Sequence, residues 1–180
     1  MEKSKHEDIL FKIFANVNDW LKFAEAKNAM ILAFNAASIY GITKTMDLDC
    51  IKESKPLMGY LFVVIIILVF SCICSLVSFA PRVKILNGGL FGPSDFSNVL
   101  FFEYLKTKSN IEIIKEVTGI VDESTFSKID KDIAEQIKQN SIIASRKYSY
   151  FTISVWLTIS AYVTPLVAGI YFLYTYFNEQ

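Results

Sequence analysis

The side chains that most often catalyse reactions or hold metals are sparse in this chain. It has one histidine, His6, close to its first residue. Cys72 and Cys74 lie in an uncharged apolar run, with no histidine or carboxylate nearby in sequence, so they fit small apolar filler better than a metal site. The adjacent acids Asp122 and Glu123 fit an ordinary helix start. We therefore expect neither an enzyme nor a protein with a metal or a resident cofactor.

A strip of polar residues enters the first apolar run of the sequence. An amphipathic N-terminal segment leads into that run without an intervening glycine or proline, which predicts one long helix. With an advance of about 100° per residue, Glu25, Asn28 and Asn35 share an arc of roughly 80°. Such a strip should face other helices rather than lipid. Snorkelling at the interface is the alternative, which suits Lys27 better than the deeper Asn35.

A second polar row accompanies an amphipathic segment at 123–147, which we expect to form one helix that continues into the last apolar run. Its apolar stripe is Ile129, Ile133, Ile137 and Ala144. The polar row lies about 60° from that stripe. A solvated flank and a ligand-binding face are both open interpretations of the row, which comprises Asp132, Gln136, Asn140 and Lys147.

Three apolar runs predict membrane spans. Residues 56–80 carry no charge, and as a helix they would extend about 37 Å, against about 30 Å of bilayer hydrocarbon. Residues 148–177 are also uncharged, with Pro165 inside and aromatic residues at both ends. Residues 29–46 are near the lower length limit for a span, and a surface-lying helix is the alternative for that run alone.

The lysines and arginines predict the orientation. Of 18 in total, five precede the first run, three lie around the link to the second, ten lie between Arg82 and Lys147, and none follows. The positive-inside rule then places the N-terminus and residues 81–147 in the cytoplasm, with the link and the C-terminus outside. Three spans satisfy this alternation and two do not. We expect an all-α integral membrane protein with spans at 29–46, 56–80 and 148–177. Residues 1–28 form a cytoplasmic amphipathic helix, and residues 47–55 form an external link. Residues 81–147 form a cytoplasmic helical bundle whose helices continue into the spans.

The cytoplasmic stretch between the second and third runs divides into a loop and short helices. Its glycines at 87–95 match no phosphate-binding or dinucleotide motif, and a helix cap at Ser94 or Ser97 is expected. A short aromatic helix is predicted at 96–107, and a second short helix should end near Gly119.

Three blocks of sequence resemble the transmembrane effectors of the Pycsar anti-phage systems. "FAEAKNAMILAFN" is similar to the family's entry to the first span, with Lys27 and Asn35 in place and Glu25 where the family usually has aspartate. "NVLFFEYL", at 98–105, is similar to its Asn-x-x-Phe-Phe element. "DIAEQIKQNSIIASRKY", at 132–148, is similar to the helix that ends in Lys-Tyr before the last span. The order and spacing of the blocks hold across nearly the whole chain.

The resemblance implies a function. Members of the family act beside a pyrimidine nucleotide cyclase that responds to infection. Cyclic UMP or cyclic CMP then activates the effector, which impairs the inner membrane, and the infected cell stops growing or dies. The implied partners are the cyclic nucleotide, membrane lipid and, functionally, the cyclase, but no nucleic acid. Because three spans in one chain enclose little water, a homo-oligomer is also expected.

A cyclic nucleotide carries one phosphate charge and a flat base, so its pocket should offer cations, aromatic faces and amides. Core packing is the alternative for Phe101 and Phe102, and membrane anchoring is the alternative for Arg146 and Lys147. The competing function is a constitutive oligomeric membrane scaffold or small transporter subunit without nucleotide gating. The expected nucleotide-binding residues are Asn98, Phe101, Phe102, Gln136, Asn140, Arg146 and Lys147.

Overall fold

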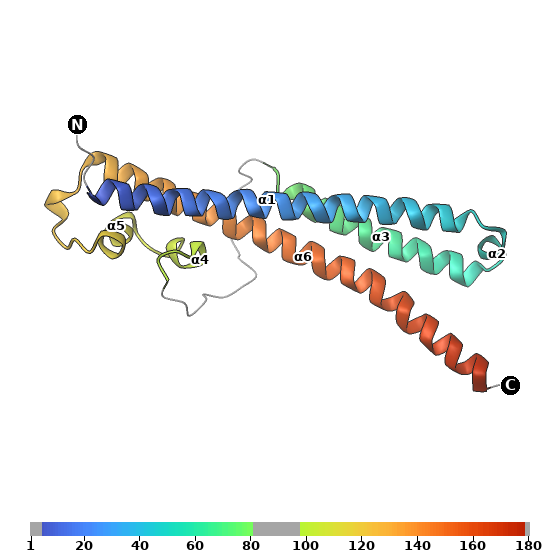
Figure 1. Cartoon of the computed structure of the whole chain (residues 1–180). Helices are drawn as coiled ribbons and strands as arrows, with labels where there is room; N and C mark the ends of the chain where they lie inside the picture. Colours follow the sequence, from blue (N-terminus) through green and yellow to red (C-terminus); the bar gives the residue numbers. More distant parts are fainter. Residues whose placement is uncertain (1–4, 81–97, 179–180) are drawn as a thin grey trace. The chain divides into compact units, whose positions relative to one another are not determined.

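The computed structural model describes residues 5–80 and 98–178, and every regular element in those ranges is helical (Figure 1). The all-α expectation is therefore confirmed for this part of the chain. The chain divides into two compact units. We name residues 1–26 with 81–149 the bundle unit, and residues 27–80 with 150–180 the apolar unit. The expected glycine loop and its cap at Ser94 or Ser97 lie outside the described residues.

Two long helices contribute to both units. Helix α1 is unbroken over Lys5–Met46, and α6 is unbroken over Lys128–Asn178. The expectation that each amphipathic segment continues as one helix into an apolar run is confirmed. Helix α6 begins later than expected, because Ser127 and Asp130 form a reciprocal cap in which each backbone N–H donates to the other's side-chain oxygen, at 2.9 and 3.1 Å. Glu123 instead starts a separate 3-10 turn, η1 (Glu123–Thr125).

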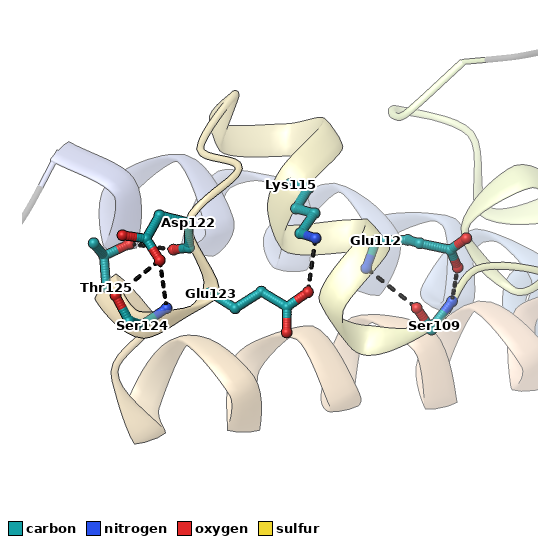
Figure 2. Close-up of polar contacts among 7 residues, drawn as sticks. All are labelled: Ser109, Glu112, Lys115, Asp122, Glu123, Ser124 and Thr125. Atoms are coloured by element: carbon teal, nitrogen blue, oxygen red, sulfur yellow. Dashed lines mark hydrogen bonds and ion pairs between the residues drawn. The ribbon is translucent and has the colours of Figure 1, made fainter.

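Helix α5 (Asn110–Thr118) is defined by its two ends, and Figure 2 shows the capping residues at its start. At its start the Glu112 N–H donates to Ser109 Oγ, and the Ser109 N–H donates to the Glu112 carboxylate, which completes a capping box. At its end Gly119 adopts the left-handed conformation at φ 75°, which glycine adopts without the steric cost of a Cβ. The predicted end near Gly119 is thus confirmed.

The predicted aromatic helix at 96–107 is wrong in length. Helix α4 covers only Phe102–Leu105, a single turn. Phe101 is extended at φ −104° and ψ 122°, and just before it the side chain of Asn98 accepts a hydrogen bond from the Leu100 N–H at 2.9 Å. This local side-chain bond offers the backbone an alternative to helix, so the helical turn starts only after it.

The core of the bundle unit is apolar and joins four elements. Helix α1 contributes one stripe at helical spacing, which packs with residues of α4, α5 and α6. The predicted stripe on α6 is right at Ile133, Ile137 and Ala144 but wrong at Ile129, which is 46% exposed. Ile129 lies in the first turn of α6, where its side chain lines a groove instead of entering the core. The fully or nearly fully buried core residues include Leu10, Val17, Leu105, Ile113, Ile114 and Ile137.

The apolar unit contains the remainder of α1 and α6, the one-turn helix α2 (Asp49–Lys52) and α3 (Lys55–Val77). Helix α3 buries only one narrow seam and exposes large apolar side chains such as Phe62 and Phe70 over its other faces. Within the described residues, α3 is the one helix long and apolar enough to cross a membrane. The two further spans, and the topology that depends on them, stay predictions.

Candidate functional site

Four aromatic side chains gather in the bundle unit and form what we name the aromatic cluster: Trp20, Phe101, Phe102 and Tyr148. Phe102 is buried, stacked on Tyr148 with 5.2 Å between ring centroids and 13° between ring planes. The ring centroids of Phe101 and Phe102 are 4.9 Å apart. The ring centroid of Trp20 is 5.7 Å from that of Phe102 and 6.2 Å from that of Phe101. Because neighbouring rings occupy the faces of Phe102, that residue serves as core. The half-buried Trp20 and Phe101 are the members better placed to offer a ring face to a ligand.

The cations beside this cluster already have acidic partners. Lys147 Nζ lies 2.9 Å from Glu25 Oε1, with the lysine side chain 13% exposed and the glutamate 46% exposed. Lys106 forms an ion pair with Glu103 and donates to Ser145 Oγ at 2.9 Å. An anionic ligand at this place must therefore compete with a carboxylate for its cation.

The expected amides do not come together. Asn98 is exposed and caps its own turn. Asn140 donates from Nδ2 to Asn18 Oδ1 at 2.7 Å, which links α6 to α1. Gln136 is 11 residues before Lys147 on the same helix, so it lies about 16 Å from it along the axis. Of the expected set, Phe101 and Phe102 belong to the aromatic cluster, and the half-buried Arg146 and Lys147 immediately precede its Tyr148 on α6.

Gln136 instead lines a groove of about 200 Å³ between α1 and α6. The lining is mostly apolar, and its one charged member is the carboxylate of Asp132. A phosphate would meet a like charge there without a compensating cation. The groove is therefore a poor site for a cyclic nucleotide, and its lining residues are Phe11, Phe14, Ile129, Asp132, Ile133 and Gln136.

The polar strip of α1 is directed toward other helices in both units. Glu25 pairs with Lys147 in the bundle unit. In the apolar unit, Lys27 Nζ lies 5.4 Å from the ring centroid of Phe151 on α6, a cation–π contact. Asn28 and Asn35 are completely buried.

Asn35 is the centre of a buried hydrogen-bond network that we name the polar layer: Asn35, Ser71, Ser75, Ser154 and Thr158. Asn35 Nδ2 donates to Ser71 Oγ at 2.7 Å, and Thr158 Oγ1 lies 2.9 Å from Asn35 Oδ1. Ser71 Oγ donates to the Ser154 carbonyl at 2.8 Å, and Ser75 Oγ donates to Ser154 Oγ at 3.0 Å. Each of α1, α3 and α6 therefore supplies part of one network.

Sequence reasoning missed every member of the polar layer except Asn35. A signal was present, because Ser71, Ser75 and Ser78 recur at helical spacing in the uncharged run of α3. Ser154 and Thr158 show the same four-residue spacing on α6. Trp20 was also missed as an aromatic surface, since it reads as one more member of the amphipathic stripe on α1.

A family model and a known protein both match most of this chain. The Pycsar effector protein domain matches residues 9–174. A protein of Propioniciclava tarda, described as Pycsar effector protein PtPycTM, is 27% identical over 150 residues, which cover 79% of this chain and 68% of that protein. No solved structure matches this chain.

Proposed function

This chain belongs to the Pycsar effector protein family, and we propose that it is the effector through which a cyclic pyrimidine nucleotide impairs the inner membrane during phage infection. Cyclic UMP or cyclic CMP, made by a partner cyclase, is the activating signal, and abortive infection is the outcome. The protein acts by binding and rearrangement rather than by catalysis. It is a homo-oligomer in the membrane, with three spans, a cytoplasmic N-terminus and cytoplasmic residues 81–147.

The continuity of α1 and α6 is the observation that carries this proposal. Each helix belongs to the bundle unit at its start and to the apolar unit farther along, without a break in the helix. A rotation or shift of either helix at a ligand site in the bundle unit is thus transmitted along the same helix. A ligand biases the membrane part only if it binds one arrangement of these helices better than another.

The ligand site of this proposal is the outer part of the aromatic cluster with Lys147. The pyrimidine base stacks on Trp20 or Phe101, and the phosphate takes Lys147 from Glu25. The Glu25 carboxylate is nearly half exposed, so a phosphate that gains several charge-assisted hydrogen bonds can displace it from Lys147. Losing that pair frees α1 from one of its contacts with α6, and this release is the physical trigger of the proposal.

The proposal is tested by dye leakage from liposomes that contain the purified protein, with cyclic UMP, cyclic CMP and cyclic AMP added in turn. Leakage with one pyrimidine nucleotide alone supports a gated effector and identifies its signal. No leakage with any of the three, from protein shown to be helical and inserted, would instead favour the constitutive scaffold or transporter subunit.

The site is tested separately by nucleotide binding to the purified protein. Lys147→Ala should weaken binding at least several-fold, because the phosphate loses its principal cation. Lys22→Ala is the matched control, since Lys22 pairs with Asp19 on the exposed surface of α1 and lies outside the aromatic cluster. Equal binding by both variants would exclude the Lys147 site without excluding nucleotide gating.

A further inference from the structure

The seam where α1, α3 and α6 meet in the apolar unit has two chemically different halves. One half is the polar layer around Asn35. The other is a buried apolar cluster of Val64, Leu68 and Ala161, which we name the apolar plug. Leu68 is completely buried and lies one turn of α3 from Ser71, so the two halves adjoin. The plug lies on the side of the polar layer that leads toward the link between α1 and α3.

The two halves respond differently to water. The hydroxyl and amide groups of the polar layer are bonded to one another, and a water molecule offers nearly equivalent hydrogen bonds to each of them. Separating the helices there exchanges one set of hydrogen bonds for another. Val64, Leu68 and Ala161 allow no such exchange, because their side chains are apolar and give water no hydrogen-bond partner. Narrow apolar constrictions in membrane pores stay dry for this reason and block ions.

From this asymmetry we infer that the apolar plug, centred on Leu68, is the gate that each subunit of the oligomer contributes to the membrane lesion, and that the polar layer beside it is the part of the path that admits water first. This inference rests on the proposed function, since it names the barrier that nucleotide binding removes. In the resting state the plug is closed by Leu68 and its neighbours, with Ile39, Ile42, Tyr60 and Ile67 packed around it.

A polar substitution at Leu68 tests the gate. Leu68→Ser should make liposomes leak without any nucleotide, several-fold faster than the wild type, because the substitution lets water into the plug. Leu76→Ser is the matched control, since it makes the same chemical change on the same helix at a side chain that is 54% exposed. Helix content and membrane insertion are measured for both variants. Leakage by Leu68→Ser that does not exceed that of Leu76→Ser would overturn the inference.

An isosteric variant covers the case in which Leu68→Ser does not fold. Thr158→Val removes one hydroxyl of the polar layer without changing the volume of the side chain, so it should lower nucleotide-triggered leakage several-fold while nucleotide affinity is unchanged. Leakage equal to that of the wild type would also overturn the inference. Absence of nucleotide-triggered leakage in the wild type counts against the proposed function instead, and the nucleotide-free comparison of the two leucine variants still decides the gate.

Discussion

The hydrogen bond between Asn35 and Ser71 allows the strength of the polar layer to be measured. In the apolar unit, Asn35 bonds to Ser71 at 2.7 Å and lies 2.9 Å from Thr158 Oγ1. Asn35→Ala removes both interactions. The hydroxyls left behind keep partners, because Ser71 Oγ donates to the Ser154 carbonyl, and Thr158 Oγ1 lies 2.8 Å from that same carbonyl. No buried donor is therefore stranded by the substitution.

The expected magnitude follows from that arrangement. Interhelical side-chain hydrogen bonds in membrane proteins average about 0.6 kcal/mol, with a maximum near 1.7 kcal/mol. Two lost bonds with no stranded donor should lower the free energy of unfolding by about 1 kcal/mol. The coupling between Asn35→Ala and Ser71→Ala in a double-mutant cycle should be about 0.6 kcal/mol, which isolates their shared bond.

The assay is reversible unfolding in mixed detergent micelles, followed by circular dichroism, for the wild type, the two single variants and the double variant. The control cycle pairs Ser38→Ala with Tyr162→Phe, whose hydrogen bond joins α1 to α6 on an exposed face. A coupling energy near zero at Asn35 and Ser71 would refute the view that this layer holds the three helices together. A loss above about 3 kcal/mol for Asn35→Ala alone would show instead that a buried group had been stranded.

Three further predictions concern the bundle unit and its surface. Glu25→Gln should raise nucleotide affinity several-fold in a binding titration, because Lys147 loses the carboxylate that competes with the phosphate, and a lowered affinity would contradict the trigger. Gly119→Ala should lower the free energy of unfolding by about 1 kcal/mol, because φ is 75° there. The control Gly41→Ala, on an open helical surface, should not destabilise the protein, and thermal unfolding of both variants measures the difference. The hydrogen bonds from Ser109, above all the one from its backbone N–H, hold the pKa of Glu112 below its ordinary value of 4.5. Their stabilisation is present above that value and is lost as pH falls through the lowered pKa, so acid titration of unfolding should show a smaller loss in Glu112→Gln, which lacks the titrating carboxylate.

The sequence predicted the features that local chemistry determines. Gly119 ends a helix because of its own backbone freedom, and α1 continues through residue 27 because nothing nearby interrupts it. The start of α6 was misplaced because two adjacent sets of capping residues compete, and only the packed structure shows that Ser127 rather than Asp122 begins the long helix.

The candidate site was harder to predict because it depends on distances between helices. Helical periodicity places Gln136 and Lys147 on related faces of α6, but it contains no information on which neighbouring helix each one meets. Lys147 meets Glu25, and Gln136 lines an apolar groove instead. The same limit explains why Asn35 was recognised as a buried polar residue although its partners on α3 and α6 were not.

The polar residues along one face of α1 change in kind as the helix enters the apolar run, and electrostatics explains the order. Glu25, before the run, keeps nearly half of its surface in solvent and has a lysine partner, so its charge remains solvated. Asn35, inside the run, is fully buried, where a neutral amide can be satisfied by hydroxyls and a carboxylate could not. In the proposed mechanism, the charged Glu25 therefore lies where an anionic ligand can compete with it for Lys147, and the neutral Asn35 lies where water can replace its hydrogen bonds. Ligand sensitivity and hydration can thus reside at different places on one continuous helix.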